Sequence, residues 1–228
     1  MIDWNSIKTV FLDMDGTLLD LHFDNYIWLE AMPREYATLH NISIKKARDH
    51  VKSQINIASG DLNAYCFRYW DKLLGIDMIK LHAQESHRIS YRPNAELLLK
   101  ALKKIDVSVF ILTNAYPDNL NLKLAITNLE KYVEKIYISH DYGYAKEEQG
   151  FWDEISKMLK FEPNKTLFID DNLANLRMAK MQGISNLHTI LKPCSNSSVQ
   201  INNEFPAIND FIDIIPQTYK SLETEKKN

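Results

Sequence analysis

The sequence predicts an α/β fold with a Rossmann-like parallel sheet at its core and a helical cap domain inserted into it. Short apolar runs rich in β-branched and aromatic residues recur along the chain, and helix-like amphipathic segments separate them. Such alternation is typical of βαβ units, which form parallel sheets covered by helices on both faces. The exception is one long block after the first run, which contains no strand-like segment.

Five runs have the length and composition of strands, and four further segments have the spacing of amphipathic helices. The predicted strands are 9–13, 107–112, 135–139, 166–170 and 186–191, and the predicted helices are 94–105, 117–132, 148–160 and 172–183. Gly183 follows the last helix, where glycine commonly ends a helix because it adopts a left-handed conformation without strain.

The block after the first strand contains three segments that we interpret as helices, 25–40, 43–55 and 63–75. We therefore predict two domains, an α/β core formed by residues 1–22 and 91–228 and a helical cap formed by residues 23–90. The linkers at 19–23 and 90–93 are the candidate hinges between them. The polar C-terminal residues, SLETEKKN, are expected to fray.

The composition narrows the class of protein and of partner. The chain is 45% hydrophobic and 25% charged, which is ordinary for a globular protein with a core. Its formal net charge of −3 argues against a nucleic-acid partner held by bulk positive charge. No segment approaches the roughly 20 apolar residues of a membrane helix, so no membrane partner is expected. Cys66 and Cys194 are too far apart in sequence to suggest a disulfide framework, which favours a cytoplasmic location. The oligomeric state is left open.

Polar side chains follow four of the predicted strands at the point where each strand ends. In chain order they are Asp13 and Asp15, then Thr113 and Asn114, then Lys146, and finally Asp170 and Asp171. The carboxyl ends of parallel strands meet at one edge of a sheet, and ligands bind just beyond that edge. We therefore expect these side chains to surround a single site.

The residue types at this site indicate its chemistry. The carboxylates of Asp13, Asp15, Asp170 and Asp171 would repel one another without a cation, and hard oxygen ligands at this density suit Mg²⁺. The ammonium group of Lys146 supplies a second positive charge. The Thr113 hydroxyl and the backbone N–H groups after the first strand can hold phosphate oxygens. The sequence therefore predicts a magnesium site that accepts a small phosphorylated ligand.

The DMDGT sequence at 13–17, Thr113 after an apolar strand, the distant Lys146 and the acidic pair at 170–171 together resemble the four motifs of the haloacid dehalogenase superfamily. Asp15 makes the chain similar to the phosphatase branch, because the dehalogenases are not expected to carry this second aspartate. The resemblance covers residues 10–183, and the cap lies where that superfamily inserts its first-type (C1) cap.

This resemblance implies a role for each motif residue. Asp13 would be the nucleophile that forms an aspartyl-phosphate, and Asp15 would be the general acid and base. Lys146 would neutralise the charge on Asp13 and the phosphate. Thr113 would bind the transferring phosphoryl group with help from Asn114. Mg²⁺ would be held by Asp13, the backbone carbonyl of Asp15, and the pair Asp170 and Asp171, of which Asp171 is the favoured direct ligand.

A narrower resemblance extends over most of the chain. The segments LDMDGTLLDLHFDNYIW, ILTNAYPDNLNLK, YGYAKEEQGFW and TLFIDDNLANL are similar to the bacterial GMP/IMP nucleotidase subgroup. Glu147 follows Lys146 here, at a position where many relatives of the superfamily carry proline. The resemblance implies a 5′-nucleotidase whose substrates are small purine monophosphates. Asn25 and Tyr26, at the start of the cap, are expected to contact the substrate.

Several other interpretations compete with this one. Asp170 and Asp171 could cap a helix, Lys146 could be a solvated surface residue, and the aromatic residues at 65–70 are typical of packing rather than base stacking. A phosphatase or phosphomutase for sugar phosphates, or a phosphatase for phosphoglycolate, would share the same core residues. Alternatives of another class are a non-catalytic phospho-acceptor regulator and a degenerate member that only binds ligand.

Overall fold

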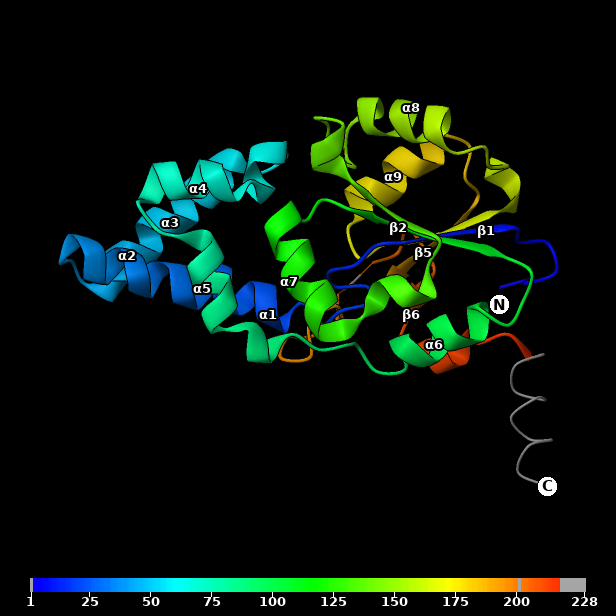
Figure 1. Cartoon of the computed structure of the whole chain (residues 1–228), viewed down its shortest axis with the longest axis horizontal. Helices are drawn as coiled ribbons and strands as arrows, with labels where there is room; N and C mark the ends of the chain where they lie inside the picture. Colours follow the sequence, from blue (N-terminus) through cyan, green and yellow to red (C-terminus); the bar gives the residue numbers. More distant parts are fainter. Residues whose placement is uncertain (1, 201, 218–228) are drawn as a thin grey trace, which may run out of the picture.

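The computed structural model describes residues 2–200 and 202–217, and a six-stranded parallel sheet lies at its centre (Figure 1). The strand order is β3-β2-β1-β4-β5-β6. The strands are β1 (Thr9–Leu12), β2 (Ser108–Thr113), β3 (Lys135–Ile138), β4 (Thr166–Ile169), β5 (Asn186–Ile190) and β6 (Ala207–Ile208). β1 is central, with Leu12 paired to Ile111 of β2 and Ile169 of β4, so the carboxyl ends of these three strands lie side by side.

Helices cover both faces of the sheet and each face has its own apolar core. α6 (Ala95–Leu102) and α7 (Pro117–Thr127) lie on one face, and α8 (Gln149–Met158) and α9 (Leu173–Met181) lie on the other (Figure 1). Alternate residues of β1 point to opposite faces, so Val10 packs in the first core and Phe11 packs with Trp152 in the second. The predicted fold class is confirmed, and all five predicted strands are present. β6 was not predicted.

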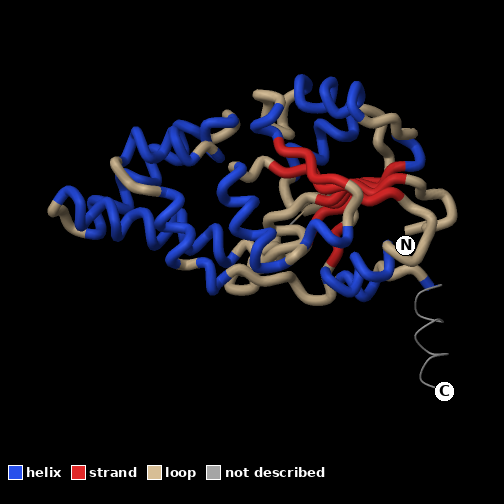
Figure 2. Tube along the Cα trace, viewed as in Figure 1, coloured by secondary structure: helices blue, strands red, loops and turns tan. Residues whose placement is uncertain are grey.

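The segment between β1 and α6 contains only helical elements and lies beside the sheet (Figure 2). Its elements are α1 (His22–Tyr26), a π-helix (Ile27–Ala31), α2 (Met32–His40), α3 (Ile44–Ala58), a 3₁₀ turn (Leu62–Tyr65), α4 (Phe67–Leu74), α5 (Met78–Gln84) and a second 3₁₀ turn (Ser86–Arg88). The single helix predicted over 25–40 is thus divided. Pro33 in the first turn of α2 has no N–H for a regular helical hydrogen bond, which explains the irregular turn before it. We keep the name cap for residues 23–90.

The two linkers of the cap are joined to each other by backbone contacts. Leu19 forms an antiparallel bridge with Tyr91, and the Asp20 N–H donates to the Ser90 carbonyl at 2.9 Å. The guanidinium of Arg92 is buried and donates to the Thr17 carbonyl at 3.4 Å. The chain therefore leaves the core and returns to it at the same place, directly beside the loop that follows β1.

Cys66 and Cys194 carry free thiols, as the sequence predicted, whereas the cytoplasmic location inferred from them stays a prediction. Among the described residues, no helix combines the length and apolar character needed to cross a membrane. The C-terminal SLETEKKN segment, predicted to fray, lies outside the described residues.

Candidate active site

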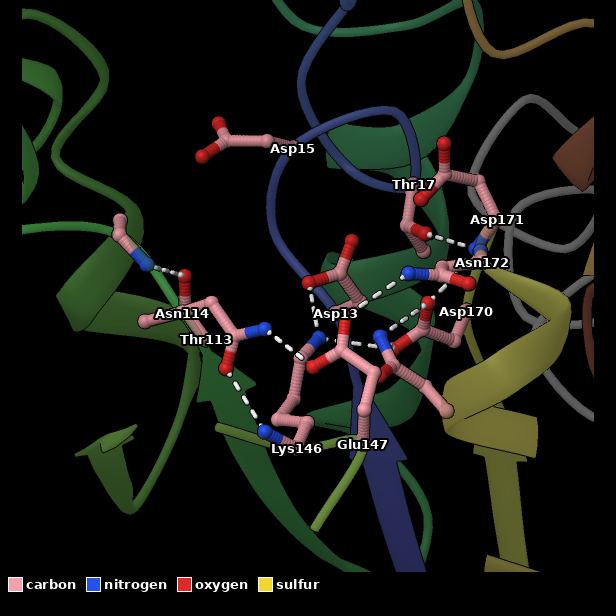
Figure 3. A network of polar contacts seen from close by, with 12 residues as sticks. Asp13, Asp15, Thr17, Thr113, Asn114, Lys146, Glu147, Asp170, Asp171 and Asn172 are labelled. Carbon is pink, nitrogen blue, oxygen red and sulfur yellow. Dashed lines mark hydrogen bonds and ion pairs between the residues drawn. The ribbon is translucent and has the colours of Figure 1, made fainter. Parts of the chain in front are cut away.

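The polar residues predicted to gather at the carboxyl edge of the sheet do lie together there (Figure 3). Asp13 directly follows β1, Thr113 ends β2, Lys146 lies between β3 and α8, and Asp170 directly follows β4. They line a cavity of about 570 Å³ between the core and the cap. The other predicted site residues that line this cavity are Asp15, Asn25, Asn114 and Asp171.

Lys146 is the central cation of this arrangement. Its side chain is 2% exposed, and its Nζ donates to Asp13 Oδ1 at 2.5 Å and to Asp170 Oδ2 at 2.7 Å. Burial alone would lower the pKa of this lysine, but the two carboxylates reverse the effect and raise it. Lys146 therefore stays protonated and joins the loops that follow β1 and β4, so it is not a solvated surface residue.

Asp170 is fully buried and is held in place by several donors. Besides Lys146, it accepts hydrogen bonds from the Asn172 N–H at 2.8 Å and from the side-chain amide of Asn175 at 3.0 Å. The N-cap of α9 is Asn172, whose Oδ1 accepts from the Ala174 N–H at 2.9 Å. Capping of α9 by a side chain thus falls to Asn172, and the acidic pair remains directed to the site.

Asp171 lies against the loop that follows β1. Its N–H donates to Thr17 Oγ1 at 3.1 Å, and its carboxylate accepts no hydrogen bond from any described residue. Gly16 has a φ of +83°, and a Cβ built there would lie 2.4 Å from Asp171 Oδ2. Only glycine combines this backbone conformation with this close approach, so Gly16 determines where the Asp171 carboxylate can be.

Asp13, Asp170 and Asp171 offer carboxylate oxygens that all lie within 4.8 Å of one another. Burial, with a contribution from the Asp170 charge, raises the pKa of Asp13 to about 7, and burial beside Asp13 raises the pKa of Asp171 well above its usual range. A buried cluster of this kind, with one carboxylate free of protein donors, fits a hard divalent cation such as Mg²⁺. The Asp15 carboxylate lies outside the cluster, so a contact of Asp15 with the ion would fall to its backbone carbonyl.

These pKa values predict that Mg²⁺ stabilises the protein more at about pH 8 than at about pH 5.5, because metal ligands must be deprotonated. Without metal, and at a pH between the ordinary and the raised pKa, the buried carboxyl groups of the folded protein hold protons that the same groups release in the unfolded chain. Its free energy of unfolding should therefore fall as the pH rises from about 4, near the ordinary pKa of 3.8, to the raised pKa of about 7.

The measurement is the Tm with Mg²⁺ and with EDTA at both pH values. At pH 8 and about 100 Kd of Mg²⁺, the expected stabilisation is about 2.7 kcal/mol. The Asp171→Asn variant serves as the control and should lose most of this response. An equal Mg²⁺ shift at the two pH values would contradict the prediction.

The carboxylate of Asp15 lies apart from that of Asp13, and both residues line the cavity (Figure 3). Its Oδ1 accepts a hydrogen bond from Lys123 Nζ at 2.6 Å. Burial, with the nearby charge of Asp24, raises the pKa of Asp15 to about 7, which Lys123 partly opposes. Both protonation states of Asp15 are therefore accessible near neutral pH, as acid–base catalysis requires. No sequence pattern singles out Lys123, because it lies among leucines in a predicted helix.

Thr113 and Asn114 differ in what their side chains contact. Thr113 Oγ1 accepts from the Ala115 N–H at 3.0 Å and lines the cavity. Asn114 Oδ1 accepts from the Lys146 N–H at 2.9 Å, and its Nδ2 donates to Glu147 at 2.8 Å. Asn114 therefore fixes the loop that carries Lys146.

Glu147 connects the core loops to the cap. Its Oε1 accepts hydrogen bonds from the Tyr65 hydroxyl and from Asn172 Nδ2, each at 3.0 Å. Burial and the Glu147 charge raise the pKa of Tyr65, so this hydroxyl stays a donor. The sequence singled out Glu147 only because many relatives have proline there.

The cap residues predicted to contact substrate occupy different places. Asn25 lines the cavity, whereas Tyr26 is not among the lining residues. The Arg88 guanidinium lies 3.8 Å from the centre of the Tyr26 ring, and the Tyr26 hydroxyl accepts from Arg34 at 3.2 Å. We therefore keep Asn25 as a candidate and leave Tyr26 out. In the aromatic stretch 65–70, Trp70 is buried in the core of the cap, in line with a packing role, whereas Tyr65 and Phe67 line the cavity.

Comparison with known proteins agrees with this geometry. The family model described as haloacid dehalogenase-like hydrolase matches residues 7–183. The GMP/IMP nucleotidase YrfG of Escherichia coli (strain K12) is 34% identical over 215 residues, which cover 94% of this chain and 97% of that protein.

Solved structures share the fold at lower identity. A HAD phosphatase from Thermococcus onnurineus superposes with a TM-score of 0.76 at 21% identity, covering 91% of this chain and 96% of that chain. L-2-haloacid dehalogenase from Xanthobacter autotrophicus gives a TM-score of 0.56 at 21% identity, covering 81% and 78%. The fold is thus common to enzymes of different chemistry, while the family model and the full-length relative define the membership. The chain belongs to the haloacid dehalogenase-like hydrolase family.

Proposed function

We propose that this hydrolase is a Mg²⁺-dependent phosphomonoesterase, specifically a 5′-nucleotidase that releases phosphate from GMP and IMP. The observation that carries the proposal is the contact of Asp13 with Lys146 beside Asp171, in a cavity that Asp15 also lines. The arrangement provides a nucleophile, a fixed cation, an acidic metal site and a separate acid–base group. The purine preference rests on the similarity to the E. coli nucleotidase.

In the first step, an Asp13 carboxylate oxygen attacks phosphorus and the bond from phosphorus to the ester oxygen breaks. Protonated Asp15 gives its proton to the departing alkoxide oxygen, so a neutral alcohol leaves. Lys146 and the Thr113 hydroxyl would hold the oxygens of the transferring group. The product of this step is an aspartyl-phosphate on Asp13 and an ionised Asp15.

In the second step, ionised Asp15 takes a proton from a water molecule, and the water oxygen attacks the phosphorus of the aspartyl-phosphate. The bond from phosphorus to Asp13 breaks, inorganic phosphate leaves, and Asp15 is protonated again for the next turnover. The raised pKa of Asp15, about 7, suits a group that alternates between these roles. Lys146 neutralises the Asp13 carboxylate that is regenerated.

Mg²⁺, held by Asp13, Asp171 and the Asp15 carbonyl, would neutralise phosphate charge and orient the substrate. Asp170 is committed to Lys146, Asn172 and Asn175, which fits a contact through water better than a direct one. The distal part of the cavity would hold the nucleoside. The aromatic side chains that line the cavity are Trp28, Tyr65 and Phe67 of the cap and Tyr116 of the core.

The test is inorganic phosphate release from a panel of nucleoside monophosphates and sugar phosphates, measured with Mg²⁺ and with EDTA. Asp13→Asn should lower kcat by at least about 10⁴-fold, because the amide cannot act as the nucleophile. Asp106→Asn is the matched control, because this aspartate is exposed and forms an ion pair with Lys8 on the surface. The control should keep wild-type activity.

The panel also separates the alternatives. Metal-dependent release from GMP and IMP, lost in Asp13→Asn, would support the full proposal. Release mainly from sugar phosphates would keep the mechanism and remove the purine preference. Transfer of phosphate between sugar positions would indicate a mutase. No release from any ester would overturn the proposal in favour of a ligand-binding or regulatory role.

A further inference from the structure

Lys123 is a buried cation with no role in the proposed chemistry. Its side chain is 1% exposed, and its Nζ donates to Asp15 Oδ1 at 2.6 Å and to the two carboxylate oxygens of Asp24 at 2.8 and 2.9 Å. The Phe23 ring centre lies 5.3 Å from the same Nζ. The three N–H groups of the ammonium thus face three carboxylate oxygens, which leaves this lysine little freedom to move.

These contacts join three segments that are far apart in the sequence. Asp15 lies in the loop after β1, Asp24 lies in α1 at the start of the cap, and Lys123 lies in α7 of the core. One turn earlier on α7, the Asn119 amide also faces Asp24 Oδ1, at 3.5 Å. Asp24 is therefore the contact point through which the first cap helix is fixed to α7.

The two carboxylates differ in what they offer the cavity. Asp24 is held through both oxygens by the same ammonium, whereas Lys123 contacts only Oδ1 of Asp15. The second oxygen of Asp15 accepts no hydrogen bond from any described residue, and Asp15 lines the cavity. An Asp15 carboxylate anchored at one oxygen keeps the other available to a reacting group.

We propose that Lys123 is a positioning residue for Asp15 and that Asp24 holds Lys123 in place, so that docking of the first cap helix on α7 sets where the acid–base carboxylate lies. This inference rests on the proposed phosphomonoesterase function. Without Lys123 the Asp15 carboxylate is still present but has no fixed orientation. Proton delivery to the leaving oxygen then fails, while attack by Asp13 does not depend on it.

The test compares two esters that need this proton to different degrees. The leaving group of GMP is the guanosine alkoxide, which requires protonation, whereas p-nitrophenyl phosphate releases a weakly basic phenolate. The readout is kcat/KM, because it reports the steps up to departure of the leaving group. If GMP is not hydrolysed, the alkyl ester that the wild type hydrolyses fastest takes its place.

Lys123→Met should lower kcat/KM for GMP by about 10²-fold, which is within the usual contribution of acid–base catalysis. The same variant should change kcat/KM for p-nitrophenyl phosphate by less than about threefold.

Asp15→Asn should likewise lower kcat/KM for GMP much more than kcat/KM for p-nitrophenyl phosphate. The double variant should have a kcat/KM for GMP little lower than that of Asp15→Asn alone, because the two residues act as one unit. Asp24→Asn should lower kcat/KM for GMP by a smaller factor, again with little change in kcat/KM for p-nitrophenyl phosphate. Thr127→Val is the matched control, since it removes the hydrogen bond from Thr127 Oγ1 to the Lys123 backbone carbonyl and leaves the Lys123 ammonium in contact with Asp15. It should affect both esters equally.

Equal losses for the two esters in Lys123→Met, or no loss for GMP, would overturn the inference and leave the proposed function intact. If Lys123→Met does not fold, Asp24→Asn decides in the same way, because it removes the carboxylate that holds Lys123 in place. The ion pair between Lys123 and Asp15 remains in this variant, so it should fold. A wild-type protein inactive on both esters would instead overturn the proposed function, and the inference with it.

Discussion

Lys146→Met should lower kcat/KM for phosphate release by at least about 10³-fold, because it removes the only cation that contacts Asp13 among the described residues. It should also destabilise the metal-free protein. Breaking a buried ion pair by removing one partner typically costs about 3–5 kcal/mol, and here two carboxylates lose the same partner. Protonation of Asp13 offsets part of this cost at low pH, since its pKa is raised to about 7.

Steady-state kinetics and thermal unfolding check both parts of this prediction. Lys157→Met is the matched control, because the same substitution there breaks an exposed ion pair with Glu154 and should change neither activity nor Tm. The Tm loss of Lys146→Met should be greater at pH 8 than at pH 5.5. A variant that keeps wild-type turnover would show that Lys146 has no part in the reaction.

Gly16→Ala should lower kcat/KM by about 10²-fold and weaken Mg²⁺ binding more than tenfold, while the fold is retained. The left-handed backbone costs alanine roughly 1–2 kcal/mol. The larger effect is local, because the new Cβ would lie 2.4 Å from Asp171 Oδ2 and must displace that carboxylate. The proposed metal ligand would then lie in the wrong place.

Gly60→Ala separates the cost of the left-handed backbone from the effect of displacing Asp171. Gly60 has a φ of +87°, close to the +83° of Gly16, but a Cβ built there meets no atom within 4 Å. It should therefore show the backbone cost in Tm and keep both activity and the Tm response to Mg²⁺. If the two variants lose the Mg²⁺ response equally, displacement of Asp171 is not the cause.

The sheet could be predicted because each buried parallel strand is a short apolar run. β1 to β5 all fall on such runs. β6 consists of only Ala207 and Ile208, and two residues show no periodicity. The predicted helix over 117–132 ends earlier, at Thr127, because Asn128 adopts a left-handed conformation with a φ of +49° and a 3₁₀ turn follows. Local pattern thus identified the elements better than their ends.

The gathering of the motif residues could be predicted because parallel strands bring their carboxyl ends to one edge. The partners of those residues could not. Lys123 meets Asp15 and Asp24 only after α7 packs beside the first cap helix, and Glu147 meets Tyr65 only when the cap lies against the core. Such contacts depend on the relative placement of distant segments, which no short sequence pattern contains. Tyr26 was a candidate because of its position after the first motif, but its ring packs beside Arg88.

The joined linkers of the cap have a consequence for how the chain folds. β1 pairs with β2, its neighbour in the sheet, although the entire cap lies between them in sequence. Closing a flexible loop of that length costs conformational entropy and slows the formation of the pair. The cap helices contact mainly one another, as in the packing of α2 on α3, and can form early. A cap that folds first would bring Leu19 and Tyr91 together and shorten the effective loop, so we expect substitutions in its core to slow assembly of the central sheet.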